Sequence, residues 1–444
     1  MRGAVLKSLM KYVVSGLLAL TLVFPAAAFA QESHSLVLDD LLKELVQTHD
    51  RIKASEAQLQ AVKHQYESAR GGYYPQVDAT AEGGRENLSK PREKQTQMDR
   101  NEMAVTAKQL LYDFGGVSGN VDAAQGRIME SESVLQQTKQ EIVSQGITAY
   151  LRVIRSRELL KYARRSEESV KELSGMQEML VERGAGYSYE ELQVKGQLAG
   201  TRSYRVTQER ELQISMNNFK SVFGFAPTMD EVQKMSTVPV PRKYLPGNVD
   251  EAIATAFDKN PLLLEITYSV DRLQGDLKNR QSTFFPRFDA VVEGQRKEND
   301  QGSTGVRTEA RAGFQMEYNL FSGFSDTEEA SSVRSEITRA KKSLLDRRRT
   351  VEESVRNAWL ELTTLRKNAE LYENQANITW EFLGLVKKKK ATGEDVRLLD
   401  ILVGERDYIS AISAKVATDI DIIIAAYSLL YQMGLITEDI TNGV

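Results

Sequence analysis

Residues 284–297 read FFPRFDAVVEGQRK, and residues 73–86 read YYPQVDATAEGGRE. The two stretches carry Pro, Asp, Ala, Glu, Gly and Arg at the same relative positions. Both begin with two aromatic residues and a proline, and both continue with alternating polar and apolar residues. Because proline ends a helix and a period of two is typical of a strand, each stretch predicts a helix-to-strand transition. The chain therefore repeats one structural plan.

The repeat sets the expected boundaries of the domains. Four of the nine prolines cluster between the halves and mark a linker. The expected parts are a signal peptide (1–30), a first structural repeat (31–226), a linker (227–247), a second structural repeat (248–433) and a C-terminal tail (434–444). Each repeat begins with one helix, over about 37–70 and 248–282, and we expect strands at about 75–85, 102–113, 286–296 and 308–320.

The first thirty residues have the composition of an export signal. Arg2, Lys7 and Lys11 are followed by an apolar stretch, and Ala28-Phe29-Ala30 is typical of a cleavage site. The apolar stretch is too short to span a bilayer comfortably. We expect export and cleavage after Ala30. No later run reaches the length of a transmembrane helix, so any membrane-spanning part has to be built from strands.

Composition excludes several classes of function. The chain has no Cys and three His, all near its N-terminus, so a thiolate metal site is excluded and a His-based site is disfavoured. A net charge of −4 argues against a nucleic-acid partner. The sequence also lacks a Gly-rich phosphate loop. We expect no enzymatic activity and no cofactor.

The predicted strands are apolar on one face and polar on the other. Phe288, Ala290 and Val292 share one face, whereas Asp289 and Glu293 share the other, and the fourth strand repeats this pattern from Ala310. Such strands, about ten residues long, suit a membrane barrel with lipid outside and water inside. A hairpin of a soluble protein, packed on a core, is the alternative for each pair taken alone. The polar face carries Asp78, Glu82, Asp289 and Glu293.

Two very long helical runs decide between these alternatives. Residues 117–183 and 324–390 contain no proline, and each would form a helix of about 100 Å. Apolar residues recur there with the spacing of a coiled coil. Each run ends at a glycine and returns as a second helix, over 189–223 or 397–433. Helices this long require neighbours along their whole length, which a compact globular domain does not provide.

One chain supplies too few strands for a water-filled barrel. Four strands leave open edges, and about eight are the practical minimum for closure. Three copies would give about twelve strands. The expected fold is mainly α with a membrane β-barrel portion: two internal repeats per chain, and a homotrimer with a twelve-stranded β-barrel continuous with a long α-helical barrel.

The repeat and its junctions carry a family resemblance. LYDFGG (111–116) and YNLFSG (318–323) stand where strand patterns give way to long helices. With the duplicated plan, they resemble the TolC-like outer-membrane efflux and type I secretion channels over residues 31–444. The resemblance implies a trimer in the outer-membrane lipid that extends into the periplasm. It also implies a periplasmic adaptor and an inner-membrane transporter, either an ABC exporter or a proton-driven pump.

The resemblance places a periplasmic gate at the helix breaks. Asp400 matches the first pore-constricting aspartate of the family, and Val403 stands where the family has a second. Glu191 is the equivalent of Asp400 in the internal repeat. Three symmetric copies would bring such carboxylates together and favour cations. The alternative is that Asp400 and Glu191 are first-turn acids stabilised by the helix dipole.

The helix-hairpin tips are the expected adaptor-docking sites. Gly184 and Gly393 match the hairpin glycine of the family, although Arg183 and Thr392 replace its neighbouring Val. Both glycines also suit plain helix C-caps. Lys390 ends a basic run that either is a solvated surface or meets an acidic partner.

The two junction phrases predict joints between strand and helix. Tyr112, Phe114, Tyr318 and Phe321 suit a membrane–water interface. Gly116 and Gly323 are expected to let the backbone turn sharply.

Two questions about function stay open at this stage. The first is whether the duct carries proteins or small molecules; the absence of a lipidation Cys favours protein secretion. The second is whether the chain is an exported coiled-coil scaffold without a pore.

Overall fold

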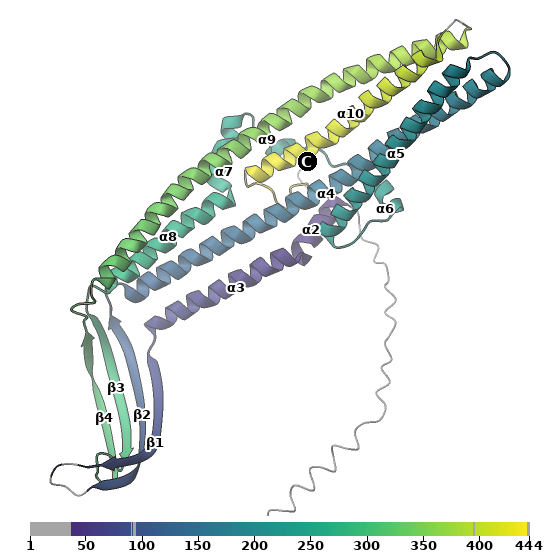
Figure 1. The fold of residues 1–444 in the computed structure, drawn as a ribbon. Coiled ribbons are helices and arrows are strands. Elements are labelled where there is room, and N and C mark those ends of the chain that lie inside the picture. The colour runs from purple at the N-terminus through teal and green to yellow at the C-terminus, as the bar shows by residue number, and fades with distance from the viewer. Residues whose placement is uncertain (1–36, 90, 92–94, 394–395, 442–444) are drawn as a thin grey trace, which may run out of the picture. The chain divides into compact units, whose positions relative to one another are not determined.

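The computed structural model describes residues 37–89, 91, 95–393 and 396–441. The predicted signal peptide and its cleavage site after Ala30 lie outside the described residues. The described elements belong to one unit by their mutual contacts. They comprise long helices and a four-stranded sheet (Figure 1).

Two helices of 67 residues dominate the fold, α4 (Gly116–Glu182) and α9 (Ser325–Ala391). Each is about 100 Å long, as their proline-free runs predict. The chain reverses after each of them: α4 is followed by α5 (Ser188–Phe223), and α9 by α10 (Leu398–Gln432). Each pair packs as a helical hairpin. In Figure 1 both hairpins extend away from the sheet.

The predicted coiled-coil seam holds the second hairpin together. Apolar residues spaced three and four apart on α9 are buried, because they face α10 and its neighbours. The buried members are Val351, Val355, Ala358, Leu362, Ala376 and Leu383.

The first helix expected in each half is in fact two helices. They are α2 (Leu38–Thr48) and α3 (Asp50–Arg70) in one half, and α7 (Val249–Lys259) and α8 (Pro261–Ser282) in the other. The predictions of unbroken helices over 37–70 and 248–282 are therefore wrong.

The two breaks have the same local cause. His49 and Asn260 adopt extended backbone, and each side chain accepts a hydrogen bond from the backbone N–H two residues later. Nδ1 of His49 accepts from Arg51 at 3.2 Å, and Oδ1 of Asn260 accepts from Leu262 at 3.0 Å. Each side chain thus caps a new helix, and the proline after Asn260 fits its first position.

The strands form one antiparallel sheet in the order β1-β2-β3-β4. β4 begins earlier than expected and ends at Glu317, so Tyr318 lies beyond the strand. The reason is that its neighbour β3 begins at Arg287, which is paired with Glu317. The strands are β1 (Gln76–Leu88), β2 (Thr96–Tyr112), β3 (Arg287–Glu298) and β4 (Val306–Glu317).

The largest apolar core surrounds the middle of the long helices. There α2 contributes four buried leucines, and the linker contributes Val232 of α6 (Met229–Lys234) and Met235 just after it. The short helix η2 (Arg242–Tyr244), later in the linker, has no buried residue. The C-terminal tail joins the same core through Ile436 and Ile440, which are 0% and 3% exposed. This core fixes the middle of the helices and leaves the sheet and the helix tips at its two ends (Figure 1).

Candidate functional site

The sheet has its polarity reversed relative to a sheet of a water-soluble protein. On β3 the apolar side chain of Val292 is 56% exposed, whereas Asp289 is 0% exposed. On β4, Phe314 is 86% exposed. The register aligns these faces across all four strands, because Val292 is paired with Ala107 and Ala312. Buried polar and exposed large apolar groups are the informative exceptions in soluble proteins. Here both occur on β3, whereas the two faces of the edge strands β1 and β4 are largely exposed.

The polar face is held together by ion pairs between strands. Lys108 Nζ lies 3.2 Å from Asp289 Oδ2, and Lys297 Nζ lies 3.1 Å from Glu102 Oε1. These charges face one another across β2 and β3, so they compensate each other on the less exposed side of the sheet. Asp289 therefore has ion-pair partners. For Asp78, Glu82 and Glu293 no ion pair is found within the described residues.

Both edges of the sheet are open. β1 pairs only with β2, and β4 pairs only with β3, among the described strands. Unpaired backbone groups at such edges are costly in hydrocarbon and invite another strand. β1 and β4 run in opposite directions, so copies of the chain can join edge to edge in the same antiparallel pattern.

The joint between β2 and α4 is fastened by Asp113. Its Oδ2 accepts a hydrogen bond from the N–H of Val117 at 2.6 Å, and its Oδ1 accepts from Gly115 at 3.2 Å. From α8, the amide of Asn279 donates to the carbonyl of Gly116 at 2.7 Å. Sequence reasoning missed Asp113 as a cap, although its place just before a helix start is the usual signal for one.

The structure corrects the role assigned to Gly116. Its neighbour Gly115 has the left-handed backbone, with φ of +104°, whereas Gly116 is the first residue of α4. A Cβ at Gly116 would lie 2.7 Å from Asp113 Oδ2 and 2.8 Å from Ser282 Oγ. Gly116 is therefore required by close packing and not by the turn.

The second joint makes its turn with a different pair of residues. Gly323 has φ of +67°, as the sequence predicts, and Phe324 follows with φ of +68°. In the first joint Phe114 has φ of +53°. An aromatic residue with positive φ is unusual and strained, so each joint combines one such residue with one glycine. No Cβ contact restricts Gly323, because no atom lies within 4 Å of its Cβ position.

Exposed aromatic side chains gather where strands meet helices. Phe114 stacks on Phe285 with ring centroids 4.8 Å apart, and Tyr112 meets Phe114 edge-on at 4.7 Å. Phe321 and Phe324 form an edge-on pair at 5.3 Å in the second joint. Several of these side chains are about half exposed or more, including Tyr73, Tyr74, Tyr112, Phe285, Tyr318, Phe321 and Phe324. A band of this composition is typical of a membrane–water interface.

The helix tips end in glycine C-caps. Gly184 and Gly393 have φ of +73° and +82°. At Gly184 the N–H groups of Gly184 and Ala185 bond to the carbonyls of Val181 and Leu180, which is a Schellman motif. Lys390 donates through Nζ to the carbonyl of Val396 at 3.0 Å, across the second tip.

The two candidate gate carboxylates each have a basic partner. Asp400 lies 3.0 Å from Arg397 Nη2, within the first turn of α10. Glu191 Oε1 lies 2.6 Å from Lys195 Nζ, which also lies 3.1 Å from Glu178 on α4. Hydrogen bonds from Glu191 and Glu178 hold the pKa of Lys195 above its ordinary value. Asp400 and Glu191 lie on different helices, α10 and α5.

An ion pair near the second tip, in which the carboxylate is buried and the lysine is half exposed, was missed by sequence reasoning. Glu405 on α10 is 4% exposed, and its carboxylate accepts a hydrogen bond from Lys387 on α9 at 2.9 Å. The pair depends on the register between two antiparallel helices, for which the sequence contains no direct signal.

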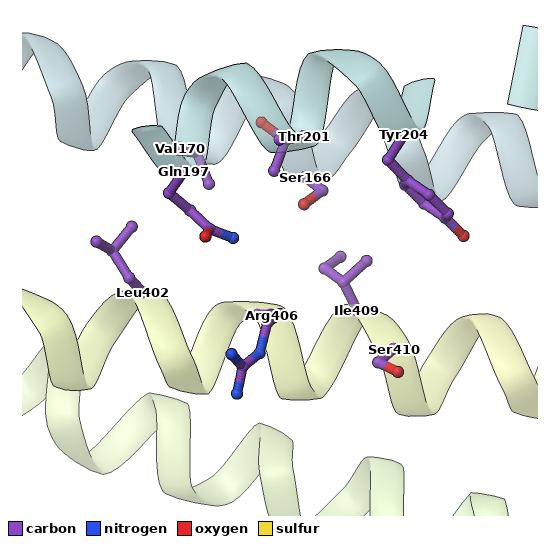
Figure 2. Close-up of a pocket in the computed structure, with 10 residues that line it drawn as sticks. Ser166, Val170, Gln197, Thr201, Tyr204, Leu402, Arg406, Ile409 and Ser410 are labelled. Carbon is purple, nitrogen blue, oxygen red and sulfur yellow. The ribbon is translucent and has the colours of Figure 1, made fainter. Parts of the chain in front are cut away.

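A cavity of about 270 Å³ lies between the two helical hairpins. Figure 2 shows side chains of α4 and α5 facing side chains of α10 across it. Val170, Leu402 and Ile409 supply apolar surface, and Tyr204 and Arg406 supply polar groups. The two hairpins are therefore not tightly packed against each other at this level.

Further apolar seams have no partner within the part of the chain that the structure describes. α9 exposes Leu371, Ile378 and Leu385 at seven-residue spacing, on residues other than its buried seam. α5 exposes Leu192 and Val206, also in heptad register. A heptad stripe exposed on a long helix indicates a neighbouring helix from another chain.

The described residues contain no metal-binding group of three or more His, Cys, Asp or Glu side chains. None of the helices described combines the length and the apolar content that a membrane crossing requires.

Comparison with known proteins agrees with these features. The sequence profile of the outer membrane efflux protein family matches residues 41–224 and 252–429. The outer membrane efflux protein BepC of Brucella suis biovar 1 (strain 1330) is 20% identical over 443 residues, which cover 99% of this chain and 93% of BepC.

Solved structures with the same fold include two outer-membrane channels. The channel OprN superimposes with a TM-score of 0.79 at 16% identity, covering 89% of each chain. The open state of MtrE from Neisseria gonorrhoeae superimposes with a TM-score of 0.73 at 15% identity, covering 90% of this chain and 89% of MtrE.

The fold is that of the outer-membrane channels. The chain belongs to the outer membrane efflux protein family, whose profile covers most of both halves. The predicted family, class of function and outer-membrane location are thereby confirmed. The family is not a family of enzymes.

Proposed function

We propose that three copies of the chain form a channel through the outer membrane, with their twelve strands closed into one β-barrel. The observation that carries this proposal is the reversed polarity of the sheet, together with its two open edges. Closure would pair every backbone group at the edges, place the apolar face against lipid and leave the polar face around water.

The long helices would continue the duct into the periplasm. Helices of about 100 Å suit this span, and the exposed seams on α9 and α5 supply surfaces for contact between copies. The aromatic side chains at the joints would lie at the inner boundary of the membrane. Three copies are the smallest number that leaves a wide lumen.

The helix tips would be the periplasmic entrance and the docking site for an adaptor. The tips are shaped by Gly184, Gly393 and Lys390. An adaptor that recognises the shape of the tips would contact these residues. The chain would perform no chemistry of its own. An inner-membrane transporter, either an ABC exporter or a proton-driven pump, would supply the energy.

Asp400 and Glu191 are the residues we propose for the gate. Each acid is paired with a basic side chain, Asp400 with Arg397 and Glu191 with Lys195. In this state the pairs partly cancel the negative charge that three copies would bring together. Both acids also lie in the first turn of a helix, where the dipole stabilises them.

Small-molecule efflux is the cargo class that we favour over protein secretion. The family is named for outer-membrane efflux proteins, and BepC is also named an outer membrane efflux protein. Deleting the gene should increase the sensitivity of the bacterium to toxic small molecules and leave its secreted proteins unchanged. Loss of a secreted protein with unchanged sensitivity would reverse this preference.

Fractionation tests the channel against the scaffold without a pore. We expect the mature chain in outer-membrane fractions, extracted only by detergent, with a mass of three chains in detergent solution. Recovery from the periplasm without detergent would contradict the channel.

A further inference from the structure

The polar face of the sheet has acids along one open edge and two exposed arginines along the other. On β1, Asp78, Glu82 and Glu86 share this face, because they are separated by four residues each. No basic residue of β1 has the same parity, since Arg85 lies on the other face. Neither Asp78 nor Glu82 has an ion-pair partner within the described part of the chain. This edge is therefore acidic.

The opposite edge presents two arginines over residues 307–311, although Glu309 and Glu317 make the polar face of β4 neutral as a whole. On β4, Arg307 and Arg311 lie on the polar face, also four residues apart. Both form ion pairs with Glu309 alone, so two guanidinium groups share one carboxylate. Their side chains are 67% and 68% exposed, whereas Glu309 is 16% exposed. Both arginines thus keep exposed charge beyond the pair they share.

The matched spacing has a geometric consequence. In an antiparallel pair, a step of four residues up one strand accompanies a step of four residues down the other. A register that places Arg311 opposite one β1 acid therefore places Arg307 opposite the acid four residues further along. This holds for Asp78 with Glu82 and for Glu82 with Glu86. The stagger required by a tilted barrel selects between these two registers.

We propose that β4 of one copy pairs with β1 of a second copy of this chain, and that Arg307 and Arg311 form ion pairs with two of the β1 acids. This inference rests on the trimer proposed above and names the charges that select its edges. The β1 acids oppose pairing of β1 with β1, because like charges would then face each other. They therefore specify a head-to-tail ring.

Charge exchange tests this proposal in the full-length protein in detergent. Arg307→Glu with Arg311→Glu should lower trimer affinity about tenfold or more, measured by mass across a dilution series. Adding Asp78→Arg with Glu82→Arg, or Glu82→Arg with Glu86→Arg, in the same chain should restore the trimer, depending on which of the two registers forms. Within one chain β1 lies about 14 Å from β4, beyond the reach of an ion pair, so the rescue acts between copies.

Arg296→Glu is the matched control for the arginine reversals. Arg296 lies on the central strand β3 and on the opposite face, so its reversal makes the charge change of one arginine reversal away from either edge. We expect its trimer to match the wild type. A β4 reversal without effect on the trimer, or a reversal that the β1 changes do not rescue, would overturn the edge pairs. A monomeric wild-type protein would instead overturn the trimer itself.

The absence of Cys allows a second, independent readout. The chain contains none, so an introduced pair reports without background. Ala79→Cys and Ala81→Cys on β1, each combined with Ala310→Cys or Ala312→Cys on β4, cover neighbouring registers of the apolar face. Oxidation should yield covalent dimers and trimers for at least one combination. Monomers in all four would contradict the pairing of β1 with β4.

Discussion

Asp289 and Val292 lie on the same strand, three residues apart and on opposite faces, and the carboxylate is fully buried while the valine is 56% exposed. Lys108 compensates Asp289 from the neighbouring strand at 3.2 Å. In a sheet surrounded by water these exposures would be reversed. This relationship is the strongest structural indication that the solvent on the apolar side is lipid.

Charge placed on the two faces of β3 should therefore have opposite consequences. Val292→Lys should destabilise the inserted protein by about 2–4 kcal/mol, because lysine would face hydrocarbon. Glu293→Lys, on the polar face one residue away, should be tolerated. Insertion into lipid vesicles and unfolding in urea measure both effects. Equal tolerance of the two changes would indicate that Val292 faces water.

The close packing at Gly116 predicts a specific cost for a methyl group. Gly116→Ala should destabilise the joint by about 1–3 kcal/mol, because the new Cβ would overlap Asp113 and Ser282. Gly384→Ala is the matched control, since it lies in the exposed surface of α9 with no atom within 4 Å. That control should be neutral or slightly stabilising. Thermal unfolding compares the two, and an equal shift in both would contradict the assignment of Gly116.

The cap at His49 predicts a dependence on pH. Burial, and then the charge of Arg51, hold the pKa of His49 below its ordinary 6.5, against the opposing effect of Asp50. A depressed pKa means that the folded state binds the proton less well than the unfolded state. The stabilisation is therefore present above pH 6.5 and is lost as the pH falls through the folded value.

Hydrogen exchange at the start of α3 measures this effect. Protonated Nδ1 cannot accept the hydrogen bond from the backbone N–H of Arg51. The exchange rate of this amide, divided by its intrinsic rate at each pH, should therefore increase as the pH falls. His49→Asn supplies the acceptor that Asn260 provides at the other break, and it should remove the dependence. A variant with the same pH profile as the wild type would show that another group is responsible.

The gate proposal predicts an effect on ion flow. Asp400→Ala removes a carboxylate from each copy and frees Arg397, so cation preference should fall and conductance should change. Lys388→Ala, at the exposed end of α9, removes a charge from the same tip without touching this pair and serves as the control. Unchanged conductance and selectivity for Asp400→Ala would remove it from the gate.

The long helices and the faces of the strands were predictable from sequence. Proline-free runs and a regular apolar spacing are local signals, and they survive in α4 and α9 because helix-forming residues fill both. The alternation from Phe288 to Gly294 is equally local, and the register of β3 with β4 preserves it. These features depend on the order of residues along the chain alone.

The helix breaks and the joints were not predictable in the same way. Pro261 is a sequence signal for the break at Asn260, whereas at His49 only the side-chain acceptor and the extended backbone reveal the break. Gly115 and Gly116 are adjacent glycines, and packing against Ser282 is needed to tell their roles apart. Such roles are set by residues distant in sequence.

Conductance in planar lipid bilayers tests the central claim most directly. The purified mature protein, added from detergent, should produce discrete steps of current that reflect a water-filled lumen enclosed by strands from several copies. Val292→Lys should reduce the number of insertion events and leave the size of each step unchanged. A wild-type protein that binds the bilayer or remains in solution without any current would contradict the account.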